Sequence, residues 1–490
     1  MPFYPFLVAL YPVLALAAYN IHEIALGDIW RPLFVSLLLA GVLLGLAFLL
    51  FRDWDRAALV SSLILLFFFS YGQVYAVLKN ISLGGVTLFR HRTLGPIWML
   101  LLVGSIYWAG WRARIRSSVT AWLNLLAALL LVYPVLTISS YMVQSTAADS
   151  TARQVITSGS GQTEARPDIY YIILDGYARQ DALKQETGLD NSDFINALKQ
   201  RGFYVASCAQ SNYAHTRPSL ASSLNYQYLD ALSASTDERL AALIKHGAVR
   251  EFLSSRGYST VAFPTGFSWT EWSDANIYPR PQYQADLPTE FENLVLGASL
   301  LRIPLDLGKL DWASESNTER YRQRVLSTLQ NMKKIPEIKE PTFTFAHIVI
   351  PHVPYVFGPN GEAVNNKAGG SSNVVGYRDQ VEFINKEILK VIDAILAGSK
   401  TPPIIILQGD HGAPVDIGTK ELRMRNLNAY YSPRAESKLY PSISPVNSFR
   451  VIFDAYFGQD LPLLPDRSYY SEPVPPYDFE PIANSCPETP

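Results

Sequence analysis

Long apolar runs dominate the first 145 residues of the chain. Each run is close to the roughly 20 residues that a helix needs to cross the hydrocarbon core of a bilayer. The first run has no basic stretch before it and no small-residue cleavage site, which favours a retained helix over a cleaved signal peptide. The pattern therefore predicts a five-helix transmembrane domain over residues 1–145, with spans at 4–21, 32–51, 57–78, 94–111 and 120–142.

Basic residues between the runs indicate the orientation, because Lys and Arg in short loops stay on the cytoplasmic side. Arg52 and Arg56 follow the second run, and the arginine-rich segment 112–116 follows the fourth. The basic residues within 79–92 argue the other way. We predict a multi-pass protein of the cytoplasmic (inner) membrane, with everything after the fifth span extracytoplasmic or periplasmic. Segment 112–116 is interpreted as a topology anchor rather than a specific lipid headgroup site.

The composition changes after residue 143 to small polar residues without an apolar period. This pattern predicts a linker over 146–166 and a catalytic domain over 167–490, which is long enough to bury a full core. The chain carries 43 acidic and 41 basic residues, so nothing suggests a nucleic-acid partner. Its two cysteines, Cys208 and Cys486, lie far apart and are expected to be unpaired.

Three short apolar runs in the second half end in groups that can bind a ligand. YYIIL at 170–174 leads into Asp175-Gly176, IIIL at 404–407 leads towards Asp410-His411-Gly412, and FTFAHIVIP at 343–351 carries a histidine. Segment 377–398 has helical spacing and precedes one of these strands, as in a mostly parallel sheet. Such sheets bind ligands beyond the carboxyl ends of their strands.

Each motif also has an ordinary interpretation. Asp-Gly and Asp-His pairs form turns, and a strand histidine often packs in the core. Carboxylate oxygen and imidazole nitrogen nevertheless both suit zinc or manganese, so Asp175, Asp410 and His411 can share one cation. His347 and His352 lie five residues apart, and His352, which lies between two prolines, is expected to be exposed.

Residues 211–225, SNYAHTRPSLASSLN, form a polar run that contains Thr216. A helix that opens with a Ser or Thr cap near Pro218 would explain it. A loop that presents a nucleophile would explain it as well. The residues alone leave both alternatives open.

The motifs together resemble the alkaline phosphatase and sulfatase superfamily. The similarity is strongest to membrane-anchored phosphotransferases such as lipoteichoic acid synthase, phosphoglycerol transferases and lipid A phosphoethanolamine transferases. The resemblance implies an α/β fold: an α/β/α sandwich with a mostly parallel sheet behind a five-helix membrane domain. TRPSL at 216–220 resembles the nucleophile segment, where sulfatases carry CxPSR or SxPSR. Thr216 cannot become formylglycine and Leu220 replaces the arginine, which argues for direct attack on phosphorus.

The resemblance also implies roles for individual residues. Thr216 would be the nucleophile, and His352 and His347 would bind phosphate oxygens or protonate the leaving group. One divalent ion would bind the site, with zinc or manganese favoured and magnesium or calcium as alternatives. Its implied ligands are Asp175, Thr216, Asp410 and His411. His215 and Arg217 would contact substrate, whereas Asn212 and Ser219 are expected to be structural.

No histidine follows His411 in the sequence. This favours a single-metal site. It also leaves open which residue protonates the leaving group. Arg423 and Arg425 could supply charge, but we expect them to be solvated residues of a helix.

These features predict a metal-dependent, membrane-anchored phosphotransferase or phosphohydrolase. Its partners would be a membrane lipid as donor or substrate and a cell-envelope glycan or lipid as acceptor. Two alternatives are a sulfatase and a catalytically inactive membrane scaffold with the same fold.

Overall fold

The computed structural model describes the whole chain except residues 1, 22–23, 25, 80, 84–85, 114–116, 154–165, 235, 282–287, 310, 365–369, 415, 473–476, 485 and 487–490. The chain divides into two compact units. One comprises Met1–Ala147 with Tyr283–Glu319, and the other comprises Ala148–Gln282 with Arg320–Pro490. A difference from the sequence-based division is that Tyr283–Glu319 groups with the apolar helices.

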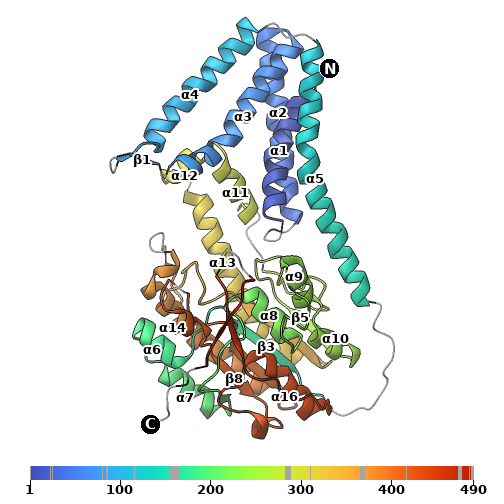
Figure 1. The fold of residues 1–490 in the computed structure, drawn as a ribbon, viewed down its shortest axis with the longest axis vertical. Helices are drawn as coiled ribbons and strands as arrows, with labels where there is room; N and C mark the ends of the chain where they lie inside the picture. The colour runs from blue at the N-terminus through green and yellow to red at the C-terminus, as the bar shows by residue number, and fades with distance from the viewer. Residues whose placement is uncertain are drawn as a thin grey trace. The chain divides into compact units, whose positions relative to one another are not determined.

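Apolar helices form most of the first unit (Figure 1). Four of the described helices are long and apolar enough to cross a membrane, and the first is shorter, at 16 residues. The predicted membrane helices are therefore found, although only four reach full spanning length. The helices are α1 (Tyr4–Tyr19), α2 (Trp30–Phe51), α3 (Trp54–Leu78), α4 (His91–Tyr107) and α5 (Ser117–Arg153).

Helix α5 continues into the predicted linker as far as Arg153. The rest of that linker up to residue 165, and also Arg114 and Arg116 of the predicted topology anchor, lie outside the described residues. A two-stranded hairpin, β1 (Ser82–Leu83) and β2 (Val86–Thr87), lies between α3 and α4.

Two short helices from the middle of the chain pack within the same unit, α11 (Glu290–Ala298) and α12 (Arg302–Asp306). A capping box formed by Thr289 and Glu292 starts α11. Glu292 also forms an ion pair with Arg31. His91 Nε2 lies 2.9 Å from Asp306 Oδ2. These contacts fix the segment to the apolar helices.

A six-stranded sheet organises the second unit, in the order β4-β8-β7-β3-β6-β5. Its centre is parallel, since β3 pairs with β6 and β7, and β5 pairs with β6. Next to the edge strand β4, β8 runs antiparallel to both neighbours. The strands are β3 (Ile169–Leu174), β4 (Tyr204–Val205), β5 (Ser259–Ala262), β6 (Thr342–Ile348), β7 (Ile404–Gly409) and β8 (Asn428–Tyr431).

Helices cover both faces of this sheet. Along β3, Tyr170, Ile172 and Leu174 join one apolar core, whereas Ile169, Tyr171 and Ile173 join the other. A strand that is buried on both faces consists of a continuous run of apolar residues, which is why YYIIL predicts a buried strand. The predicted α/β/α sandwich is confirmed.

The helices of the second unit include the predicted segment 377–398, which is α14 (Val374–Gly398). The others are α6 (Gln180–Thr187), α7 (Ser192–Gln200), α8 (Thr216–Leu224), α9 (Asp237–Lys245), α10 (Ala248–Ser255), α15 (Lys420–Met424) and α16 (Pro445–Phe457), and α13 (Asp311–Met332) crosses the boundary between the units. Near the end of the chain β9 (Ser468–Tyr470) pairs with β10 (Glu480–Ile482).

The expectation that the cysteines are unpaired was wrong. Cys208 and Cys486 form a disulfide, with their Cα atoms 5.5 Å apart. Chain folding brings together residues that are 278 positions apart, a proximity that spacing in the sequence cannot reveal.

Candidate active site

The central strands bring the predicted site residues to one edge of the sheet. Asp175 follows β3, Asp410 and His411 follow β7, and His347 lies near the end of β6. Because β3 lies between β6 and β7 and runs parallel to both, the carboxyl ends of the three strands are neighbours.

A buried group of acidic and imidazole side chains results. The candidate ligand atoms of Asp175, His347 and Asp410 all lie within 4.8 Å of one another. His347 Nε2 is 3.1 Å from Asp175 Oδ2, and His411 Nε2 is 3.4 Å from Asp410 Oδ2. Thr216 Oγ1 lies 3.4 Å from His411 Nε2. The four predicted metal ligands therefore lie close together. His347, which was not predicted to be a ligand, lies among them.

Backbone contacts hold the two strand-end loops together. The Gly176 N–H donates to Asp410 Oδ1 at 2.8 Å, and the Ser219 hydroxyl donates to the Asp410 carbonyl at 2.7 Å. His411 Nδ1–H donates to the Gly412 carbonyl at 2.8 Å. This bond leaves the lone pair of His411 Nε2 directed at the carboxylates, as a metal ligand requires. The expectation that Ser219 is structural fits these contacts.

The charges of the group depend on one another. Burial, and then the neighbouring Asp175 carboxylate, raises the pKa of Asp410 to about 6. Burial alone would raise the pKa of Asp175, but the imidazoles of His352 and His347 hold it below its usual range. Burial and the Arg423 guanidinium hold the pKa of His411 well below its ordinary value, so this imidazole is neutral.

These residues fit a divalent cation. Asp175 Oδ1 and Asp410 Oδ2 are buried and have no hydrogen-bond partner among the residues that the structure describes. Two buried carboxylates this close repel each other unless a positive charge lies between them. Carboxylate oxygen and neutral imidazole nitrogen are ligands for zinc and manganese. The buried Asp/His/Asp group can therefore hold a metal ion.

Thr216 is the first residue of α8, directly after the cap residue His215. His215 Nε2–H donates to the Ser471 carbonyl at 2.9 Å. Arg217 forms an ion pair with Asp237 and lies over the Trp269 ring, 4.9 Å from its centroid. Both flanking residues are thus close to Thr216 in the chain, but their polar groups have partners of their own.

His352 lies beside Asp175 on the other side. Its backbone N–H donates to the Asp175 carbonyl at 3.1 Å, and its Nδ1–H donates to the Val353 carbonyl at 2.7 Å. The side chain is half-buried rather than fully exposed. In the part of the chain that the structure describes, its Nε2 makes no hydrogen bond.

The expectation that Arg423 is a solvated helix residue was wrong. Its Nε donates to the Ala214 carbonyl at 2.8 Å and its Nη1 to the Ala413 carbonyl at 3.1 Å, while Nη2 lies 3.4 Å from His411 Nε2. Among the described residues it contacts no carboxylate within ion-pair distance. Arg425, two positions on, instead pairs with Asp181 at 3.0 Å.

Gly412 explains why Arg423 comes so close. A side-chain carbon at Gly412 would lie 2.7–2.8 Å from the carbonyl oxygens of Leu422, Arg423 and Arg425. Only glycine allows α15 to pack directly on the loop after His411. Helix α15 has five residues, too few for an apolar period, so the sequence offered no signal that separates Arg423 from Arg425.

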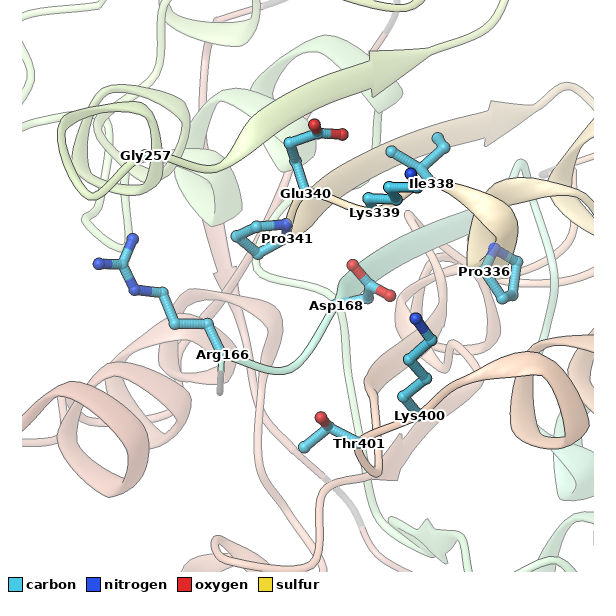
Figure 2. A pocket seen from close by; sticks show the side chains of 10 residues that line it. All are labelled: Arg166, Asp168, Gly257, Pro336, Ile338, Lys339, Glu340, Pro341, Lys400 and Thr401. Carbon is cyan, nitrogen blue, oxygen red and sulfur yellow. The ribbon is translucent and has the colours of Figure 1, made fainter. Parts of the chain in front are cut away.

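A concavity of about 380 Å³ lies at the opposite, amino ends of the strands. Figure 2 shows Asp168 just before β3 and Pro341 just before β6, with Lys400 nearby. It contains none of the predicted site residues.

Residues 167–439 match the sulfatase family model. No curated protein matches the chain. Similar solved structures include the C-terminal periplasmic domain of EcEptC from Escherichia coli in complex with Zn, with 11% identity, 60% of this chain and 83% of that chain covered, and a TM-score of 0.40.

Two further structures are similar at the same low identity. Lipooligosaccharide phosphoethanolamine transferase A (EptA) from Neisseria meningitidis has 12% identity, 92% and 94% coverage and a TM-score of 0.38. The putative sulfatase yidJ from Bacteroides fragilis has 11% identity, 62% and 77% coverage and a TM-score of 0.39. The family match covers more than half of the chain, and the predicted family is confirmed: this protein belongs to the sulfatase family.

Proposed function

We propose that this protein is a metal-dependent, membrane-anchored phosphotransferase that forms a covalent intermediate on Thr216. One observation carries the proposal: the Thr216 hydroxyl lies 3.4 Å from His411 Nε2, beside the buried Asp175–His347–Asp410 group. The proposed ion is zinc or manganese, held by Asp175, Asp410 and His411 together with Thr216.

A threonine hydroxyl is a weak nucleophile near neutral pH. A bound divalent ion supplies positive charge that lowers the pKa of a hydroxyl at the site and stabilises charge on the transferred phosphoryl group. In the first half-reaction a bond forms between Thr216 Oγ1 and phosphorus as the hydroxyl proton passes to solvent, and the bond from phosphorus to the donor alkoxide breaks. His352 Nε2 is assigned to protonate that alkoxide. In the second half-reaction the acceptor hydroxyl gives its proton to His352 Nε2 and its oxygen bonds to phosphorus, while the bond from phosphorus to Thr216 Oγ1 breaks and Oγ1 takes a proton from solvent.

Arg423 is assigned to bind the non-bridging phosphate oxygens. Two of its nitrogens are bound to backbone carbonyls, so the third is held in position before substrate arrives. Guanidinium groups pair well with phosphate oxygens because they offer several fixed donors. His215, Arg217 and His347 are proposed to act around the same phosphoryl group, in binding it or in positioning the ligands.

The donor is proposed to be a lipid-linked phosphodiester. Four long apolar helices attach the domain to a membrane, where headgroups reach a high effective concentration. The Cys208–Cys486 disulfide favours an oxidising compartment, and hence an extracytoplasmic domain on a multi-pass inner-membrane protein. The acceptor is proposed to be a cell-envelope glycan or lipid.

The test uses the purified full-length protein in phospholipid nanodiscs with a divalent ion. Release of diacylglycerol from labelled phospholipid is measured for the wild type, Thr216→Ala and Thr216→Ser. We expect the wild type and the serine variant, which keeps a hydroxyl, to turn over, and the alanine variant to be inactive. Equal turnover by the alanine variant would refute the role of Thr216. Hydrolysis of sulfate esters alone would favour the sulfatase alternative, and absence of both metal and turnover would favour the scaffold.

A further inference from the structure

The membrane unit contains a cavity of about 680 Å³ that is unrelated to the buried metal-binding group. It is lined by α1, α3, α5 and α11, and all its lining residues belong to this one unit. A cavity of this volume is in the range of ordinary ligand pockets.

The cavity is a groove along one face of α1. Leu7, Tyr11, Ala15 and Tyr19 recur at intervals of four residues along its wall. The wall runs from Leu7 to Asn20, a length of about 20 Å at 1.5 Å per residue. Half of a 30 Å hydrocarbon core is about 15 Å, so the groove is about as deep as one leaflet and its headgroup region.

Polarity changes along the groove. Apolar residues of α1, α3 and α5 form most of the lining, Leu7, Leu66 and Leu130 among them, whereas Asn20 and Gln73 lie near the carboxyl ends of α1 and α3. The Gln73 amide is exposed and makes no hydrogen bond to the described part of the chain. An unpaired amide is costly in hydrocarbon but is satisfied by a lipid ester or phosphate at the headgroup level.

Helix α11 distinguishes this groove from an ordinary lipid-facing surface. Its residues Leu294 and Ala298 line the cavity. A side-chain carbon at Gly72 would lie 2.1 Å from the Gly297 carbonyl oxygen, so α11 packs directly on α3. Helix α11 also lies inside the segment 167–439 that matches the family. A helix of the catalytic sequence thus forms part of the groove.

We propose that the groove binds the acyl chains of one membrane phospholipid, with its headgroup at the end that carries Asn20 and Gln73. This inference rests on the proposed function, in which such a lipid is the phosphoryl donor. The apolar wall, the depth of one leaflet and the polar end together match the two parts of a phospholipid.

The test combines photocrosslinking with two matched variants. The full-length protein is reconstituted in nanodiscs that contain a phospholipid with a diazirine in its acyl chain. Leu130 lines the groove and is 45% exposed, whereas its neighbour Leu129 is 58% exposed and does not line it. Leu130→Trp therefore narrows the groove, and Leu129→Trp places the same side chain on the lipid-facing surface. Ala15→Trp, on α1, is a second narrowing variant.

We expect crosslinks concentrated in the peptides of α1 and α3 that line the groove, reduced at least fivefold by Leu130→Trp and by Ala15→Trp but not by Leu129→Trp. Turnover of the long-chain phospholipid should fall in parallel, and turnover of a short-chain, water-soluble analogue should not. Crosslinks spread evenly over all helices, or equally reduced by Leu129→Trp, would overturn the proposal. If the wild type turns over neither donor, the proposed function fails, and the crosslinking pattern still decides whether the groove binds lipid.

Discussion

Replacing Arg423 by glutamine should slow phosphoryl transfer without removing the metal. The substitution removes the positive charge next to His411 while keeping a polar group near the position of Arg423 Nε, which donates to the Ala214 carbonyl. Arg425→Gln is the matched control, because Arg425 lies on the same short segment but pairs with Asp181.

The expected magnitude follows from one lost charge-assisted contact. A hydrogen bond to a charged group contributes about 1.5–3 kcal/mol. At about 1.4 kcal/mol for each factor of ten, the loss corresponds to a rate reduced about 10- to 150-fold. Arg425→Gln breaks a partly exposed ion pair, worth at most about 1 kcal/mol of stability, and should leave the rate unchanged.

The assay is diacylglycerol release at saturating metal, with bound metal measured for every variant. Arg423→Lys should recover part of the rate because it keeps the charge, and added guanidinium should partly rescue Arg423→Ala. Equal rates for Arg423→Gln and Arg425→Gln at equal metal content would refute the assigned role. Loss of metal in Arg423→Gln would instead mean that Arg423 positions His411.

The remaining predictions concern stability and metal. Burial raises the pKa of Glu186 to about 7, although the charges of Arg423 and Arg425 act to lower it. Between the ordinary pKa of a glutamate and about pH 7, Glu186 is therefore protonated in the folded state and ionised in the unfolded state. The free energy of unfolding should therefore fall by about 3 kcal/mol as pH rises from about 4.5 to 7, and Glu186→Gln should flatten this dependence in thermal melts of the full chain; an unchanged slope would contradict it. Gly412→Ala should displace α15 and reduce both transfer and stability, by about 1–3 kcal/mol for the latter, whereas Gly45→Ala, where the added carbon meets no described atom outside the backbone of α2 within 4 Å, should reduce neither in the same melts and rate assays. Chelation should lower the melting temperature of the wild type, because the two buried carboxylates lose their shared cation; a melting temperature independent of metal would argue against the site.

Much of the site could be predicted because its residues lie at the ends of apolar strands. Asp175, Asp410 and His411 each follow a run that is buried on both faces, and parallel pairing then makes the loops neighbours. The roles of these residues remain predictions, since proximity alone does not establish catalysis.

Other features depend on tertiary structure that local sequence does not encode. Arg423 reaches His411 only because Gly412 lets α15 pack closely, and a five-residue helix has no period to reveal this. The Cys208–Cys486 bond joins distant parts of the chain. The apolar residues of α11 do not indicate which unit the helix belongs to. Its contacts with α1 and α3 place it in the unit of apolar helices.

The central claim is a covalent phosphoryl group on Thr216, and acid trapping tests it most directly. The full-length protein is incubated with the divalent ion and labelled phospholipid, quenched in acid and analysed by peptide mass spectrometry. The account predicts an adduct on the peptide that contains Thr216, with a mass that identifies the transferred group, and no adduct in Thr216→Ala. Turnover of the phospholipid with the Thr216 peptide unmodified, or with the adduct on another residue, would contradict it.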